Sequence, residues 1–188
     1  MGAIESPTRI KLTVDQYYRI TDAGVFPADA RLELINGEIF EMSPIGTLHA
    51  GTVDRLAQAL ILALGRRAIV GIQRPVQAPE YSEPQPDLVL LPPRDDFYTS
   101  RHPLPEDVLL VIEVADTSLQ FDRTVKARLY AAHGVPEYWV VDARSRTIEV
   151  LRSPHADGYA EAYVLSGKAL VSPLAFVDCR WTVDELLG

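Results

Sequence analysis

The sequence predicts an α/β fold in which a mixed central sheet is flanked by two long helices. The run 108–115 is apolar apart from Glu113, which is typical of a strand buried on both faces in the middle of a sheet. Residues 47–64 and 120–133 carry apolar side chains at the helical period. A further strand at 137–142 follows the second helix, so a right-handed crossover between parallel strands is expected.

The N-terminal part predicts a short helix followed by a β-hairpin. A capping-box pattern at 13–16 opens a helix that ends at about residue 21. Asn36 and Gly37 then separate the runs 31–35 and 38–42. Asn-Gly between such runs is the strongest short-range hairpin signal, because both residues tolerate positive φ.

The middle of the chain predicts the first long helix and two strands of the sheet. The helix begins at about Thr47, and Gly65 ends it. Strands are expected at about 69–77 and 86–91. The next segment, 92–105, holds four prolines and many polar residues, so it predicts a surface loop.

The C-terminal part predicts an antiparallel extension of the sheet. The second long helix begins between residues 119 and 122, and Gly134 followed by Pro136 stops it. Beyond the strand at 137–142, strands are expected at 147–151 and 159–165. A capping box at 182–185 predicts a short final helix.

Length and composition predict one domain over residues 1–188, with its core at about 47–142. The 47% of hydrophobic residues are enough for a sizeable core. The single cysteine, Cys179, excludes an internal disulfide, and residues 1–11 contain no apolar stretch that could serve as a signal peptide. We therefore expect a cytoplasmic protein, and no segment is apolar enough over sufficient length to span a membrane.

The formal net charge of −8 bears on the partners that this chain can bind. Proteins that coat nucleic acids usually present a basic surface, so the acidic balance argues against that class. It does not exclude a nuclease, because metal ions offset the acidic residues of an active site.

The one charged residue of the central strand, Glu113, points to a functional site. A glutamate is almost never fully buried unless it is paired or coordinates a metal. Asp87 at the entrance of the preceding strand and Lys126 on the following helix can converge with Glu113 at one edge of the sheet. Two carboxylates suit Mg²⁺ or Mn²⁺, and the ammonium could orient a water or neutralise charge on a phosphoryl group. The alternative is a structural ion pair between Glu113 and Lys126.

The same residues carry a resemblance that spans about residues 13–152. The chain resembles the Uma-two family of bacterial restriction-endonuclease-like proteins, which belongs to the PD-(D/E)xK nuclease superfamily. The matching motifs are Pro86-Asp87, Ile112-Glu113-Val114, the stretch from Asp122 to Lys126, the stretch from Gly134 to Asp142, and upstream Glu33 to Glu38 and Ser43-Pro44 with His49.

The resemblance implies a restriction-endonuclease-like core and a metal-dependent endonuclease that acts on DNA. Asp87 and Glu113 would bind Mg²⁺, with Mn²⁺ as a substitute, and Lys126 would be the catalytic lysine. Glu33 and His49 are the auxiliary candidates. A catalytically inactive scaffold that binds a partner is the alternative function. Nucleases that cut both strands often pair two active sites, so a homodimer is one arrangement that the sequence leaves open, and the sequence does not fix the oligomeric state.

Two departures from the superfamily pattern stand out. The lysine that normally follows two residues after the second acid is replaced by Ala115. In the family that the chain resembles, a lysine of the following helix takes this role, which is why Lys126 is the candidate. Relatives also show a serine-proline pair where this chain has Asp116-Thr117-Ser118, so the geometry of that loop is expected to differ.

Overall fold

The structure, a computed structural model, describes residues 8–188. The expectations of one domain over 1–188 and of no signal peptide at 1–11 extend outside this range. The strands are β1 (Leu32–Ile35), β2 (Glu38–Glu41), β3 (Ile69–Ile72), β4 (Leu88–Leu91), β5 (Leu110–Ala115), β6 (Glu137–Asp142), β7 (Thr147–His155), β8 (Gly158–Ser166), β9 (Leu170–Val171) and β10 (Trp181–Thr182). The α-helices are α1 (Val14–Asp22), α2 (Thr47–Leu64), α3 (Leu119–Phe121), α4 (Ala127–Ala132) and α5 (Val183–Leu187).

Within the described residues, six strands form the central sheet, in the order β3-β4-β5-β6-β7-β8. In this sheet β5 and β6 pair in parallel, and the other neighbours are antiparallel, so the sheet is mixed as predicted. All six residues of β5 are buried, because strands and helices surround it on every side. The parallel pair encloses the second long helix, which confirms the predicted strand-helix-strand unit.

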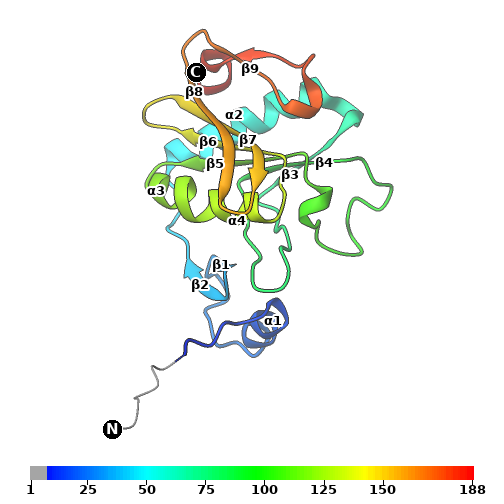
Figure 1. Ribbon diagram of the computed structural model, residues 1–188, viewed down its shortest axis with the longest axis vertical. Coiled ribbons are helices and arrows are strands. Elements are labelled where there is room, and N and C mark those ends of the chain that lie inside the picture. Colours follow the sequence, from blue (N-terminus) through cyan, green and yellow to red (C-terminus); the bar gives the residue numbers. More distant parts are fainter. Residues whose placement is uncertain (1–7) are drawn as a thin grey trace.

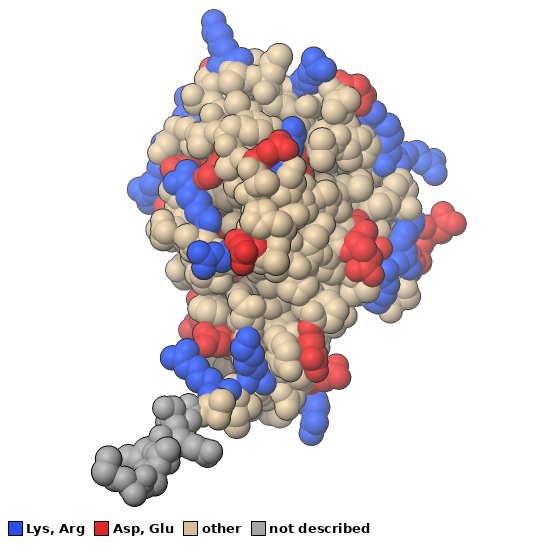
Figure 2. Space-filling view, viewed as in Figure 1, with Lys and Arg blue, Asp and Glu red and all other residues tan. Residues whose placement is uncertain are grey.

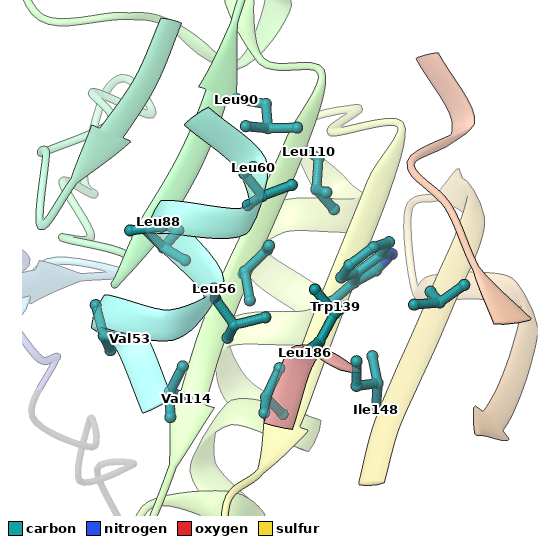
Figure 3. Close-up of a cluster of buried hydrophobic side chains, with 14 of the residues drawn as sticks. Val53, Leu56, Leu60, Leu88, Leu90, Leu110, Val114, Trp139, Ile148 and Leu186 are labelled. Carbon is teal, nitrogen blue, oxygen red and sulfur yellow. The ribbon is translucent and has the colours of Figure 1, made fainter. Parts of the chain in front are cut away.

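Helices cover both faces of the sheet (Figure 1). On one face α2 and α5 pack against alternate residues of β4, β5 and β6, with Leu56, Leu60 and Trp139 at the centre (Figure 3). On the opposite face α4 contributes Ala127 and Tyr130 to a second core. The alternation of side chains along each strand therefore divides the core into two layers.

The N-terminal segment forms its own small unit beside the sheet. The Thr13–Gln16 capping box is present at the start of α1, and the β1–β2 hairpin turns at Asn36 and Gly37, both with positive φ. Tyr17 packs against Leu34 in a separate small core. The Glu83 N–H donates to the Leu34 carbonyl at 2.7 Å, which attaches the hairpin to the segment before β4.

Three elements differ from the sequence prediction. Strand β3 ends at Ile72 rather than near residue 77, because Gln73 adopts a positive φ of 45°. The second long helix contains a π-helical turn, η3 (Asp122–Lys126), between α3 and α4. The two-residue pairing of β9 with β10 was not predicted. Single-turn 3₁₀ helices at Gly65–Arg67, Pro105–Asp107 and Leu174–Phe176 complete the elements.

Candidate active site

A cavity of about 250 Å³ opens where β4 begins and β5 ends, between the sheet and the N-terminal hairpin. We call it the site cavity. All five residues that the sequence singled out line it: Glu33, His49, Asp87, Glu113 and Lys126. They come from β1, α2, the entrance of β4, β5 and η3. The structure thus brings the five candidates together, although 93 sequence positions separate the first from the last.

The antiparallel pairing of β4 with β5 places the two central carboxylates side by side. Leu88 pairs with Ile112. Extending this antiparallel register by one residue places Asp87 opposite Glu113. The Val114 N–H donates to Asp87 Oδ2 at 2.9 Å and fixes this carboxylate against the end of β5. The other oxygen, Oδ1, lies 3.0 Å from His49 Nε2.

Lys126 joins the carboxylates of two different strands. Its Nζ donates to Glu113 Oε1 at 2.9 Å and to Glu33 Oε1 at 3.1 Å, and it lies 3.0 Å from Glu33 Oε2. The second contact to Glu33 is electrostatic, because its angle does not allow a hydrogen bond. Tyr130 also donates its hydroxyl to Glu113 Oε1, at 2.9 Å. The ion pair that the sequence left open as an alternative to a metal site is therefore present.

Burial and charge together set the protonation of this cluster. Burial alone would lower the pKa of Lys126, but Glu113 and Glu33 outweigh it and raise the pKa above its usual range. Burial raises the pKa of Glu113 well above its usual range. The Lys126 ammonium lowers this pKa, and the negative charge of Asp87 raises it further. The hydrogen bond to Asp87 raises the pKa of His49. Lys126 is thus an ammonium at neutral pH.

Asp122 is a further acid of the cavity that the sequence reasoning did not include as a site residue. Its side chain is buried, lines the site cavity and accepts a hydrogen bond from Ser118 Oγ at 2.5 Å. Burial raises its pKa, and Lys126 lowers it. The signal was its spacing of four residues before Lys126, which places both on one helix face.

The π-helical turn carries Lys126 to this position. The Ala127 N–H bonds the Asp122 carbonyl, five residues earlier, and Tyr138 donates its hydroxyl to the same carbonyl at 3.2 Å. Along β5, Ala115 lies on the same face as Glu113, because side chains alternate along a strand. A lysine of the helix that covers this face therefore reaches Glu113 without a lysine at position 115.

The family of the chain follows from a comparison with family models. The model described as "Uma2: Putative restriction endonuclease" matches residues 14–184. The chain belongs to this family. The resemblance read from Asp87, Glu113 and Lys126 is thereby confirmed at the level of the family, and these residues lie within the matched range.

A solved structure shares the fold of this Uma2 protein. The crystal structure described as a putative nuclease belonging to DUF820 from Anabaena variabilis ATCC 29413 superposes with a TM-score of 0.72 and 18% sequence identity. The match covers 94% of this chain and 97% of that one. No curated protein matches the chain. The likeness confirms the restriction-endonuclease-like fold class.

The donor set of this Uma2 site fits a hard divalent cation. Asp87 and Glu113 present carboxylate oxygens to one cavity, and Mg²⁺ commonly takes one or two carboxylates and completes its shell with waters and substrate phosphates. Three buried acids, Glu113, Glu33 and Asp122, act on the ammonium of Lys126. Among residues 8–188, no group of three or more His, Cys, Asp or Glu side chains is arranged so that it could hold a metal ion.

Proposed function

We propose that this Uma2 protein is a cytoplasmic, metal-dependent endonuclease of the PD-(D/E)xK type that hydrolyses phosphodiester bonds in DNA. The observation that carries the proposal is the placement of Asp87 and Glu113 side by side in one cavity, with the ammonium of Lys126 2.9 Å from Glu113. The family description and the name of the Anabaena protein, both of which refer to nucleases, support the same activity.

Asp87 and Glu113 would hold Mg²⁺, or Mn²⁺ in its place. When bound, such an ion acidifies a water and offsets charge on the phosphate. The surrounding residues prepare the two ligands: Val114 N–H and His49 fix Asp87, whereas Tyr130 and Lys126 fix Glu113. These contacts hold the carboxylates in place before a substrate arrives, which favours binding and turnover.

Lys126 would act as a cation rather than as a base. The carboxylates of Glu113 and Glu33 keep its pKa above the usual range, so it does not release its proton near neutral pH. A fixed ammonium beside the cavity stabilises negative charge as it develops on the phosphoryl group. Glu33 would position this ammonium by its two contacts of 3.0 and 3.1 Å.

The surface charge implies that DNA is contacted locally. On the face in Figure 2, Lys and Arg are interspersed with Asp and Glu, without a continuous basic patch among the described residues. The whole chain has a formal charge of −8. Binding that depends on a few phosphates and a metal ion should therefore be weak at physiological salt and strengthen as salt is lowered.

A catalytically inactive scaffold is the second candidate function. The observation that favours it is the ion-pair cluster itself, in which Lys126 contacts both Glu113 and Glu33 and already compensates part of their charge. In that case the same fold would mediate association with a partner, and the buried charges would serve only the structure.

A cleavage assay separates the two functions. Supercoiled plasmid and circular single-stranded DNA are incubated with the protein and Mg²⁺, Mn²⁺ or EDTA. We expect cleavage only with metal, and a loss of about a hundredfold or more in Glu113→Gln and Lys126→Met, since each removes a group that acts on the transition state. Glu106→Gln, which changes an exposed carboxylate, is the matched control.

Two results would contradict the proposal. Cleavage that persists in EDTA would remove the metal from the mechanism, and a Lys126→Met variant that retains the normal rate would remove the lysine. Circular dichroism and thermal unfolding of each variant establish that lost cleavage is not lost folding.

A further inference from the structure

The lining of the site cavity includes a second cation besides Lys126, namely Arg31. Arg31 directly precedes β1 and stands two residues before Glu33, so the two side chains leave the chain on the same face. The Met42 N–H donates to the Arg31 carbonyl at 2.8 Å, which continues the β1–β2 pairing by one step. Arg31 therefore belongs to the ordered wall that the hairpin gives to the site cavity.

Arg31 differs from the other charged groups of this lining in having no partner of opposite charge. Most of the lining acids lie at ion-pair distance from a cation: Glu33 and Glu113 from Lys126, Asp87 from His49, and Asp116 from Arg144. Within residues 8–188, no carboxylate lies at that distance from the Arg31 guanidinium. An arginine with a merely electrostatic structural role would be expected to use one of the nearby acids.

Most of the hydrogen-bond donors of Arg31 remain available. Its Nη1 donates to the Ser43 carbonyl at 3.0 Å, and this is the side chain's one hydrogen bond within residues 8–188. A guanidinium carries five N–H donors in a planar fork. The residue is half-buried, whereas Lys126 is buried. Arg31 can therefore meet a molecule that enters the cavity from solvent.

Arg31 lies beside the Asp87 half of the candidate metal site, and Lys126 lies beside the Glu113 half. Lys126 contacts Glu113 directly, at 2.9 Å. His49 contacts Asp87, and this hydrogen bond raises the pKa of His49, while the nearby positive charge of Arg31 opposes the rise. A phosphate between the two halves would thus have a cation near each of them.

The chemistry of the lining indicates why a phosphodiester needs such a group. Five acids line the site cavity: Glu33, Asp87, Glu113, Asp116 and Asp122. They repel a polyanion, and the Lys126 ammonium is already held by two of them. A guanidinium fork matches two oxygens of one phosphate through parallel N–H···O bonds. Arg31 is the lining cation that can offer this fork.

We propose that Arg31 binds the phosphodiester that enters the site cavity, through paired N–H···O bonds to its non-bridging oxygens, and so positions the DNA backbone against Asp87 and Glu113. This inference rests on the proposed nuclease function. It assigns Arg31 to binding and positioning rather than to the chemical step. Because the contact is to phosphate, it carries no preference for a base sequence.

The salt dependence of DNA binding tests this without any cleavage. Fluorescein-labelled single-stranded and duplex DNA are titrated with the protein at a fixed Ca²⁺ concentration and several NaCl concentrations, and anisotropy follows the form that binds more tightly. Ca²⁺ also takes carboxylate ligands, so it offsets the acids of the cavity. A gel establishes that the DNA stays intact.

The expected result is the loss of one phosphate contact in Arg31→Gln. Each contact contributes about 0.9 to the slope of log K against log [NaCl] for a duplex, and about 0.7 for a single strand. Arg31→Gln should make the slope shallower by this amount and weaken binding about tenfold at low salt.

Two further variants separate phosphate binding from net charge and from folding. Arg66→Gln removes an exposed arginine just beyond the far end of α2 from His49, and it should leave slope and affinity unchanged. Arg31→Lys keeps the charge but not the planar fork, so the slope should stay as in the wild type while the affinity falls severalfold. Thermal unfolding shows whether each variant is folded, and Arg31→Lys carries the test if Arg31→Gln is not.

The outcomes separate this inference from the nuclease proposal. Wild-type slope and affinity in the folded Arg31 variants, an equal loss in Arg66→Gln, or no binding of either DNA to the wild type would overturn the inference, whether or not DNA is cleaved. A protein that cleaves no DNA but loses one phosphate contact in Arg31→Gln would overturn the nuclease function alone.

Discussion

At the scale of single residues, the site is governed by an excess of buried acids over buried bases. Glu33, Glu113 and Asp122 are at most 4% exposed, and they share the ammonium of Lys126. One ammonium cannot compensate three carboxylates, so part of their negative charge must be protonated or balanced by another cation, whereas Asp87 has His49 as its partner. This imbalance is the reason to regard the cluster as a binding site rather than as an ordinary ion pair.

Glu83 is another buried acid, and it should make the free energy of unfolding depend on pH. Burial raises the pKa of its carboxyl in the folded protein, so the neutral form is favoured on folding. The stabilisation is complete below the unfolded value of about 4.3 and is lost as the pH rises through the folded value. Glu83→Gln does not titrate. Its stability relative to wild type should therefore increase as the pH rises above about 4.3.

Urea unfolding of wild type and Glu83→Gln across this pH range measures the difference. Glu80→Gln is the control, since its carboxylate is exposed and neighbours the same segment. A difference between Glu83→Gln and wild type that stays constant with pH, or narrows as the pH rises, would contradict the assignment of Glu83 as an uncompensated buried acid.

At the scale of elements, local signals predicted those parts of the fold that local interactions determine. The α1 capping box, the Asn36-Gly37 turn and the end of α2 at Gly65 were all predicted. The early end of β3 at Gln73 and the short β9–β10 pair were not, because both involve contacts with residues distant in the sequence. The Gln73 N–H, for example, donates to the Asp87 carbonyl at 2.9 Å.

Local signals in the sequence predicted part of the candidate site as well. A charge in an apolar strand identified Glu113, but the partners that complete the site come from distant elements. Tyr130 and Asp122 follow the spacing of four residues on either side of Lys126, and this pattern could have pointed to both. Nothing in the local sequence marks Gln85, which lines the site cavity and whose N–H donates to Glu33 Oε1 at 3.1 Å.

The β1–β2 turn offers a test at this scale. Gly37 has a φ of 83°, and a Cβ there would lie 2.5 Å from Lys11 Cβ. Gly24 has a φ of 70°, but a Cβ added there would meet no atom within 4 Å. Gly24→Ala should cost about 1 kcal/mol from its backbone conformation alone, and Gly37→Ala should cost clearly more.

Urea denaturation gives both free energies of unfolding. Equal costs for Gly37→Ala and Gly24→Ala would show that the approach of Lys11 to the hairpin does not constrain it. The result matters for the site, because β1 of this hairpin carries Glu33.

At the scale of the whole molecule, the fold sets the sheet and the N-terminal hairpin around one cavity. None of the helices within residues 8–188 has the length and apolarity that a membrane crossing needs. Cleavage of both strands of a duplex would need two such cavities, so we expect two copies of the chain to pair on DNA. Each copy would supply its own Asp87, Glu113 and Lys126.

The most direct test of the proposal that this protein is a metal-dependent nuclease is a calorimetric titration with Mn²⁺. The titration is made with and without an uncleavable oligonucleotide. We predict saturable binding to the wild type and to Glu106→Gln, and its loss in Glu113→Gln, because that change removes one of two carboxylate ligands. No binding at millimolar metal, even with the oligonucleotide that supplies phosphates, would contradict the account and leave the buried charges as a structural cluster.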